Sequence, residues 1–110
     1  MVWAMSHSAA ADSVFHALSN PTRRKVLERL SAGPATVSEL AAPFDMQLPS
    51  FVQHLSVLEQ SRLVQSSKRG RVRTYAIAPD RFKVVEDWLT ARRRLWEARL
   101  DRFDHYVTHL

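Results

Sequence analysis

Residues 36–77 read TVSELAAPFDMQLPSFVQHLSVLEQSRLVQSSKRGRVRTYAI. Their apolar spacing and turn signals predict a short helix, a tight turn and a second helix, which runs directly into a β-hairpin. The hairpin tip, residues 68–73, holds four cations in six residues and no acid. A helix-turn-helix beside a basic hairpin is typical of a DNA-binding surface, in which one helix reads base edges and a basic ribbon contacts phosphates.

Length and composition narrow the class of protein. A chain of 110 residues is one domain, and 45% apolar and 25% charged residues are typical of a folded protein. The net charge of +5 favours a polyanionic partner, either nucleic acid or a membrane surface. The absence of cysteine excludes disulfides and thiolate metal sites. With no signal peptide and no apolar run of the roughly 20 residues that span a bilayer, we expect a cytoplasmic protein with no membrane partner.

Two helix starts carry capping signals. Asn20 followed by Pro21 predicts the start of a helix that runs to about Leu30, because Asn is a good N-cap and Pro is tolerated at the first helical position. Thr36 and Glu39 fit a capping box, in which each side chain bonds to the backbone amide of the other residue. The sequence therefore predicts a short helix directly after Thr36.

The helix expected from about Pro49 to Ser61 has one apolar and one polar face. At about 100° per residue, Phe51, Leu55 and Leu58 share a narrow face that we expect to be buried. The opposite face and its flanks carry short or polar side chains, which suit a major groove. These residues are Pro49, Ser50, Val52, Gln53, Ser56 and Gln60. An ordinary amphipathic helix with a solvated face is the alternative, and the adjoining basic hairpin favours DNA.

The hairpin is predicted from two strand-like runs. Residues 63–64 start the first strand, residues 71–77 form the second, and Gly70 marks the turn. Long Lys and Arg side chains at the tip can reach phosphates or enter a narrow minor groove. A solvated charged turn is the alternative, but such turns usually mix signs and this one does not.

The order and spacing of five blocks within residues 9–90 resemble the ArsR family of bacterial winged-helix repressors. The blocks are LSNPTRR at 18–24, VSELA at 37–41, LPSFVQHLSVLE at 48–59, LV at 63–64 and GR at 70–71. The resemblance implies a homodimeric transcriptional regulator that binds a palindromic operator of double-stranded DNA. Its recognition helix would be residues 48–61, and its wing would be residues 66–75.

On this basis the expected fold is mainly α with a small β-hairpin wing: a winged helix-turn-helix with a long C-terminal helix. Residues 1–8 are expected to form a flexible N-terminus, followed by a first helix over residues 9–18. Residues 9–78 would form the DNA-binding domain. Residues 79–110 would form a dimerisation helix within the same compact domain.

Two departures from the family pattern bear on DNA contact. Family members often have serine at the position of Gln47, the cap of the recognition helix, and at the position of Val52. Glutamine is a weaker cap, and valine offers no hydrogen bond, although it can contact a thymine methyl group. The chain also lacks the cysteines of metal-sensing members. It lacks their aspartate-x-histidine pair as well, because Asp104 and His105 are adjacent. It therefore resembles the branch without a cysteine metal site.

The candidate DNA contacts come from the helix and the hairpin. From the helix they are Gln47, Pro49, Ser50, Val52, Gln53, His54 and Ser56. From the hairpin they are Lys68, Arg69, Arg71 and Arg73. Gln53, Ser50 and His54 are the candidates for base readout, although His54 borders the buried face, where a structural role is favoured.

The C-terminal helix should begin at Pro79-Asp80 and extend for up to roughly 30 residues, too long for one small core to cover. Its apolar residues recur every seven positions at Phe82, Leu89, Trp96, Phe103 and Leu110. This stripe could pack within the chain or against a second copy. We expect the first half to pack on the body and the rest to complete a dimer. The candidate dimerisation residues are Val14, Phe15, Trp88, Leu89, Leu95, Trp96, Leu100 and Phe103.

Other functions receive less support. No phosphate loop or nucleophile arrangement predicts an enzyme, and no cofactor is expected. Asp101, His105 and His109 lie four residues apart on one helical face, which leaves a metal-responsive repressor as an alternative. The aromatic stripe of the last helix could instead bind a protein partner or a lipid surface, although its acidic residues would repel anionic lipid.

Overall fold

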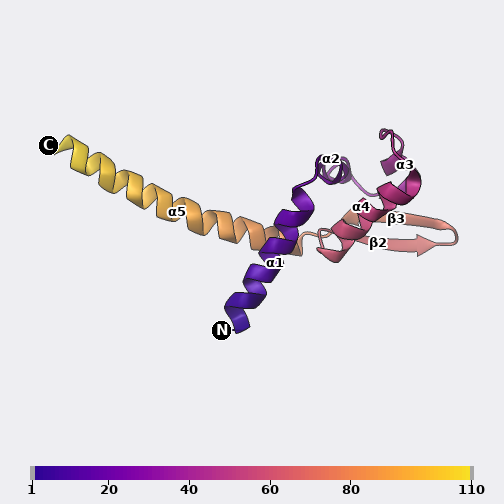
Figure 1. Ribbon diagram of the computed structural model, residues 1–110, viewed down its shortest axis with the longest axis horizontal. Helices are drawn as coiled ribbons and strands as arrows, with labels where there is room; N and C mark the ends of the chain where they lie inside the picture. Colours follow the sequence, from indigo (N-terminus) through magenta and orange to yellow (C-terminus); the bar gives the residue numbers. More distant parts are fainter. Residues whose placement is uncertain (1, 110) are drawn as a thin grey trace.

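The computed structural model describes the backbone of residues 2–109 and the side chains of residues 9–109. The chain forms helices with one small sheet (Figure 1). The elements in order are α1 (Val2–Leu18), α2 (Pro21–Leu30), β1 (Ala35–Thr36), α3 (Val37–Ala41), α4 (Leu48–Gln60), β2 (Val64–Arg69), β3 (Val72–Ile77) and α5 (Asp80–Thr108). The expected mainly α fold with a hairpin wing and a long last helix is confirmed.

The described part of the chain is elongated, with extents of 68 × 34 × 22 Å. The body consists of α2, α3 and α4 with the sheet beside them (Figure 1). The β2–β3 hairpin extends from one side of this body, and α5 extends from the other as a long arm. α1 crosses α5 near the start of that arm and packs against it.

Both predicted helix caps are present. The Asn20 side-chain oxygen accepts hydrogen bonds from the amides of Thr22 at 2.9 Å and Arg23 at 3.2 Å. At α3, the Thr36 hydroxyl accepts from the Glu39 amide at 3.2 Å, and the Glu39 carboxylate accepts from the Thr36 amide at 3.1 Å. These bonds satisfy amides that the first turn of a helix leaves without partners, so the chain itself specifies where α2 and α3 begin.

The core lies where α1, α2, α4 and the sheet meet. Phe51, Leu55 and Leu58 are fully buried, as their spacing on α4 predicts. The core also takes in residues from every other element, namely Val14, Ala17, Val26, Leu27, Leu30, Ala35, Leu40, Leu63, Val64, Tyr75 and Val85. Because the buried face of α4 is fixed in this way, the orientation of its opposite face is fixed too.

The sheet is antiparallel, with strand order β1-β3-β2. Its register pairs Ser66 with Tyr75 and Lys68 with Arg73 in the hairpin. The strand β1 was not predicted from the sequence, because two residues are too short to show an alternating pattern. Gly70 closes the hairpin with a φ of 61°, a left-handed conformation that glycine adopts without strain.

An unpredicted turn connects α4 to the hairpin. After the C-cap Ser61, Arg62 has a φ of 61°, and its amide bonds to the Glu59 carbonyl at 3.0 Å. The Leu63 amide bonds to the Leu58 carbonyl at 3.1 Å. These two bonds define a Schellman motif, in which the left-handed position is usually glycine. The motif ends α4 and directs the chain into β2.

Two expectations need correction. α1 begins at Val2 rather than at residue 9, so the helix includes backbone that the sequence assigned to a flexible N-terminus. Val14, expected at the dimer contact, has no exposed surface and lies in the core of its own chain. It lies on the face of α1 that packs into the core, whereas the neighbouring Phe15 is 38% exposed and packs against Trp88 of α5. Among the described residues, no helix is long and apolar enough to cross a membrane.

Candidate nucleic-acid interface

The outer face of α4 is free. With the apolar face packed inward, the side chains of Pro49, Ser50, Gln53 and Ser56 are all exposed, and Val52 joins them. They lie along the surface that the helical pattern predicted. The arrangement presents short hydrogen-bonding groups and one branched apolar group, which together can read base edges in a major groove.

Gln47 is the N-cap residue of α4, in an extended conformation, and its side chain makes no capping hydrogen bond. The expectation of a weak cap at this position is therefore confirmed. Pro49 partly offsets the missing cap, because its fixed φ suits the first turn of a helix and it has no amide that needs a partner.

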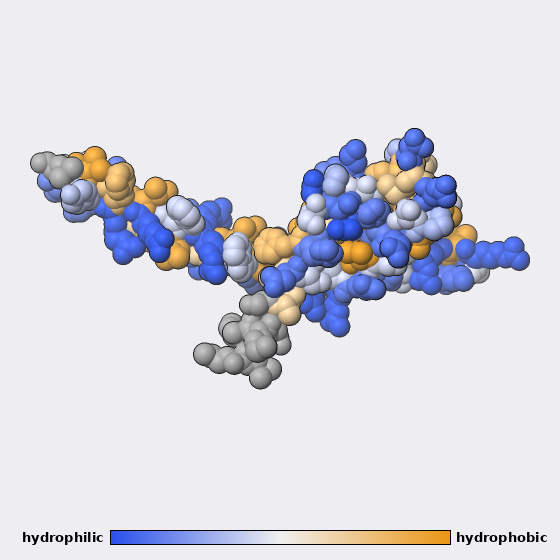
Figure 2. All heavy atoms as spheres, viewed as in Figure 1, coloured by the Kyte–Doolittle hydropathy of each residue, from blue (hydrophilic) through white to orange (hydrophobic). Residues whose placement is uncertain are grey.

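The basic hairpin tip projects into solvent. Lys68, Arg69 and Arg71 are exposed, and none of them forms a hydrogen bond or ion pair with another described side chain. Figure 2 shows hydrophilic surface over the whole projecting end of the hairpin. Because no acid neutralises them, these cations remain available to a polyanion.

Arg73 differs from the other three cations because it is tied to the body. Its Nη1 donates to the Ser66 hydroxyl at 2.8 Å, and that hydroxyl donates to the Glu59 carboxylate at 2.6 Å. This chain of bonds joins both hairpin strands to the C-terminal end of α4. Arg73 therefore helps to fix the angle between the hairpin and α4, which limits its freedom to contact DNA.

His54 is the one base-readout candidate that does not face outward. It is half-buried, and its Nδ1 lies 3.2 Å from Nη1 of Arg23. Burial lowers the pKa of His54, and the nearby charge of Arg23 lowers it further. Both effects favour the neutral ring. The structure therefore places His54 in the structural role that its position on the helical wheel favoured.

Arg23 is a residue that the site prediction did not include. It is only 8% exposed, and besides His54 it contacts the backbone at the end of α1. The sequence did contain a signal, because Arg23 precedes Val26, Leu27 and Leu30 by three, four and seven residues. That spacing places it on the buried face of α2. Its charge, within the run Arg23-Arg24-Lys25, hides the pattern.

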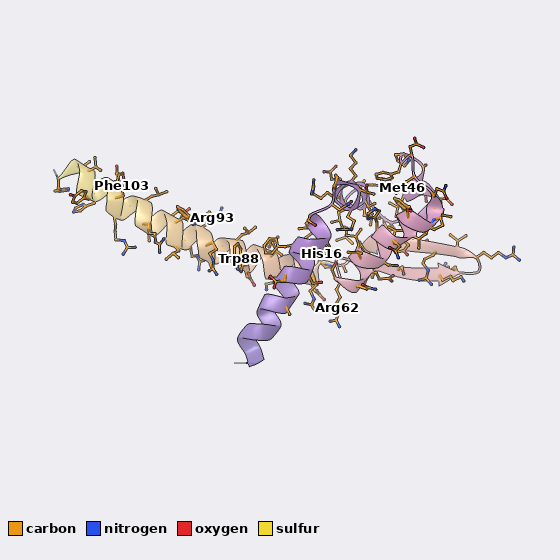
Figure 3. All side chains as sticks on the ribbon, in the orientation of Figure 1. His16, Met46, Arg62, Trp88, Arg93 and Phe103 are labelled. Atoms are coloured by element: carbon orange, nitrogen blue, oxygen red, sulfur yellow. The ribbon has the colours of Figure 1, made fainter. Side chains whose placement is uncertain are left out.

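The α1–α5 crossing brings together part of the predicted dimer contact. Phe15 and Trp88 pack edge to face with ring centroids 5.5 Å apart, and the Arg92 guanidinium lies 4.7 Å from the Trp88 centroid. Figure 3 shows Trp88 close to this crossing and Phe103 far out along the arm. Beyond residue 90, every described side chain of α5 is exposed, so this chain alone leaves the outer stripe uncovered.

The described residues do not form the metal site that the sequence left as an alternative. The described residues include no group of three His, Cys, Asp or Glu side chains placed to hold a metal ion. The rings of His105 and His109 stack with centroids 4.0 Å apart, and His109 Nδ1 lies 2.8 Å from the His105 carbonyl oxygen. That nitrogen is therefore engaged with the backbone.

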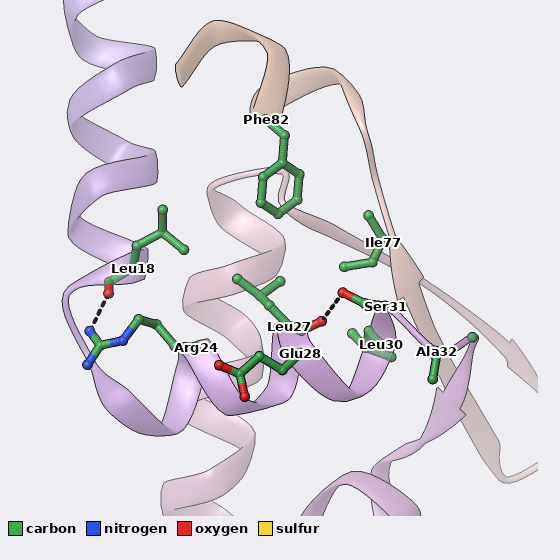
Figure 4. A pocket seen from close by; sticks show the side chains of 10 residues that line it. Leu18, Arg24, Leu27, Glu28, Leu30, Ser31, Ala32, Ile77 and Phe82 are labelled. Carbon is green, nitrogen blue, oxygen red and sulfur yellow. Dashed lines mark hydrogen bonds between the residues drawn. The ribbon is translucent and has the colours of Figure 1, made fainter. Parts of the chain in front are cut away.

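A pocket of about 710 Å³ lies between α2 and the connection from β3 to α5 (Figure 4). Phe82 and Ile77 face Leu27 across it. Two polar wall residues are already bonded to backbone: Arg24 donates to the Leu18 carbonyl at 2.7 Å, and Ser31 to the Leu27 carbonyl at 2.9 Å. The wall also includes the charged side chain of Glu28, and the rest of the lining is mostly apolar. The pocket lies at the junction of the body and the arm.

The fold and this surface define a winged helix-turn-helix DNA-binding protein. Residues 18–66 match the family described as a helix-turn-helix domain. Transcriptional repressor SdpR of Bacillus subtilis is 35% identical over 78 residues, which cover 71% of this chain and 87% of that protein. HTH-type transcriptional regulator Rv2034 of Mycobacterium tuberculosis is 40% identical over 75 residues, which cover 68% and 70% respectively.

Solved structures show the same similarity over most of the chain. The ArsR family transcriptional regulator RHA00566 is 54% identical with a TM-score of 0.79, covering 82% of this chain and 93% of its own. An ArsR-like transcriptional regulator from Rhodococcus sp. RHA1 is 29% identical with a TM-score of 0.74, covering 87% and 91%. The chain belongs to the ArsR family of helix-turn-helix transcriptional regulators. It is a DNA-binding regulator, not an enzyme.

Proposed function

We propose that this protein is a homodimeric repressor that binds a palindromic operator through α4 and the β2–β3 hairpin. The observation that carries the proposal is the apolar stripe of α5, exposed in the single chain, together with a free α4 outer face beside an unneutralised basic hairpin.

The arm supplies the dimer contact. With 29 residues and a rise of about 1.5 Å each, α5 is roughly 43 Å long, and only Val85 on it is buried. The large apolar side chains that remain exposed along it are Trp88, Leu89, Leu95, Trp96, Leu100, Phe103, Tyr106 and Val107. Figure 2 shows this hydrophobic surface recurring along the arm. A contiguous apolar stripe marks a protein contact, and a second copy offers the same seven-residue repeat as its complement.

A two-fold axis gives the DNA contact its specificity. One α4 helix can read only a few base pairs, whereas two related by symmetry can read half-sites about 34 Å, or roughly 10 bp, apart. In each half-site Ser50 and Gln53 would contact base edges. Lys68, Arg69 and Arg71 would contact the phosphate backbone or the minor groove beside it.

Repression follows from occupancy, because a dimer bound across a promoter excludes other proteins from the same DNA. The name of SdpR describes it as a transcriptional repressor, which supports the same direction of control here.

The test is selection of duplexes from a random-sequence pool by the purified protein, followed by binding titrations at several salt concentrations. We expect the enriched duplexes to share an inverted repeat and to bind far more tightly than a scrambled duplex of equal length. Specific affinities typically exceed non-specific ones by about 10³-fold or more. A pool that yields no inverted repeat, or equal binding to both duplexes, would contradict the proposal.

A further inference from the structure

We propose that Arg23 is a positioning residue, which sets the angle of α4 relative to α1 and thereby controls how well the protein discriminates its operator from other DNA. This inference rests on the proposed function. It assigns to a buried arginine of α2 a role in DNA recognition, although that arginine does not face the DNA.

One guanidinium group joins three points. Its Nε donates to the Ala17 carbonyl at 2.7 Å, its Nη2 donates to the His16 carbonyl at 3.1 Å, and its Nη1 lies 3.2 Å from Nδ1 of His54. The first two contacts lie on the last turn of α1 and the third lies on α4. Because a guanidinium is planar and rigid, fixing two of its nitrogens on α1 also fixes where the third can meet α4.

Among the side chains that the structure describes, no acid pairs with the charge of Arg23. The ion pair formed among the described residues is that between Arg29 and Glu39, at 3.8 Å. The carbonyl oxygens at the C-terminal end of α1 carry the negative end of the helix dipole, and they solvate the guanidinium instead. Arginine stays protonated and can only donate, so His54 accepts at Nδ1 and carries its proton on Nε2.

Arg23 links two helices that have different proposed roles. α1 packs on α5, the proposed dimer arm, whereas α4 carries the candidate base contacts. Arg23 bonds to both helices from α2, which lies between them in the chain. His54 is adjacent to Gln53 in sequence, so any rotation or tilt of α4 at His54 displaces Gln53 as well. Functional side chains tolerate displacements of only about 0.5 Å.

Arg24 provides a matched control on the same helix. Its Nη1 donates to the Leu18 carbonyl at 2.7 Å, so it also holds the end of α1. It is exposed, and no described hydrogen bond links it to α4. Substituting Arg24 therefore removes an equivalent bond to α1 and leaves the link to α4 in place.

The experiment compares four variants: Arg23→Lys, Arg24→Lys, His54→Leu and His54→Asn. Each variant is titrated against the duplex that the unmodified protein enriches from a random pool and against a scrambled duplex. The readout is the ratio of the two affinities, measured where circular dichroism shows the variant to be folded. We expect Arg23→Lys and His54→Leu to lower this ratio roughly tenfold, because each loses a charge-assisted bond, while binding to the scrambled duplex changes little.

The remaining variants separate positioning from general stability. Arg24→Lys should keep the ratio of the unmodified protein. His54→Asn should recover much of the ratio lost in His54→Leu, because the Asn oxygen can accept from Arg23 near the place of Nδ1. If Arg23→Lys fails to fold, His54→Leu carries the test alone, since it leaves the bonds from Arg23 to α1 intact.

Two results would overturn the inference while leaving the proposed function standing. One is an unchanged ratio in His54→Leu. The other is an equal fall in Arg24→Lys and Arg23→Lys. If the unmodified protein enriches no duplex, both the proposed function and this inference are wrong.

Discussion

Among single residues, His54 has an environment that favours the neutral ring. Nη1 of the buried Arg23 lies 3.2 Å from its Nδ1, so a proton on that nitrogen would replace a hydrogen bond with a repulsion between two cations. Burial first, and Arg23 second, lower the pKa of His54 below its ordinary value. The neutral ring is therefore part of the folded state.

We expect this shift to appear as acid sensitivity. Below about pH 6.5 the unfolded chain gains a proton on His54 before the folded chain does. The stabilisation by the neutral ring is therefore fully present above that pH, and it is lost as the pH falls through the lower folded pKa. Urea unfolding at pH 7 and pH 5 should show a larger loss of unfolding free energy for the unmodified protein than for His54→Asn. Equal losses would show that His54 does not titrate in this way.

Val52 is a candidate for a contact with the methyl group of a thymine. It is exposed on the outer face of α4, where family members often have serine, and it offers only methyl groups. If it contacts a thymine methyl, replacing that thymine by deoxyuridine should weaken binding about fourfold, the value of one buried methyl group. Replacing each operator thymine in turn should find one sensitive position per half-site. In Val52→Ser, the same replacement should no longer weaken binding. If it weakens binding by Val52→Ser as much as binding by the unmodified protein, the contact is excluded.

At the scale of elements, the end of α4 and the hairpin form one connected unit. The Schellman turn at Arg62 directs the chain into β2, and the Glu59–Ser66–Arg73 chain of bonds holds the hairpin strands against α4. These bonds fix the orientation of the hairpin relative to α4 in the structure. A DNA groove that accepts α4 also sets where the hairpin cations can reach.

Arg62 occupies a backbone conformation that costs an L-residue free energy. Its φ of 61° suits glycine, and no other described non-glycine residue has a positive φ. We expect Arg62→Gly to raise the free energy of unfolding by about 0.5 to 1 kcal/mol, the relief of left-handed strain less the added entropy of the unfolded chain. Urea unfolding measures this change. Gln60→Gly, two residues earlier at the last position of α4, should destabilise instead, and stabilisation by both or neither would contradict the assignment.

The hairpin tip should act through phosphates. Arg71→Ala should weaken binding on all sequences and should reduce the slope of log affinity against log salt by about 0.9, the value for one phosphate contact. Arg94→Ala removes the same charge from the exposed arm and should leave the slope nearly unchanged. An unchanged slope in Arg71→Ala would remove the hairpin tip from the interface.

Local patterns predicted most elements, because their signals are local. The caps at Asn20 and Thr36, the buried face of α4 and the glycine turn depend on residues close together in sequence. The strand β1 was missed because its pairing with β3 depends on tertiary structure alone. Arg23 was missed because its burial depends on tertiary contacts, namely those with the end of α1 and with His54. Val14 was misplaced because the first helix has two apolar faces, and only packing shows which one lies inside.

Taken as a whole, the molecule is a small body joined to a long helical arm, and the body covers only the first part of that arm. The body fixes α4 and the hairpin, while the arm beyond residue 90 leaves all its described side chains exposed. In the proposed dimer, the apolar stripe of the arm would gain stability from a second copy, and that copy would supply the other half-site. Dimerisation and specific DNA binding are thus expected to be lost together.

We expect the double substitution Trp96→Glu with Leu100→Glu to give a monomer that stays folded. Both residues are more than half exposed in the single chain, so the core is untouched, whereas two buried charges would prevent the arm from pairing. Ala98→Glu, on another face of the same helix, is the control and should remain a dimer. Sedimentation equilibrium gives the masses, and a double variant that still dimerises would place the interface elsewhere.

The most direct measurement is the stoichiometry of the complex with the enriched duplex, determined by sedimentation velocity across a titration. We expect a free protein of twice 12.6 kDa and a complex of two chains per duplex, with no stable complex of one chain. A single 12.6 kDa chain that binds the full site with undiminished specificity would contradict it.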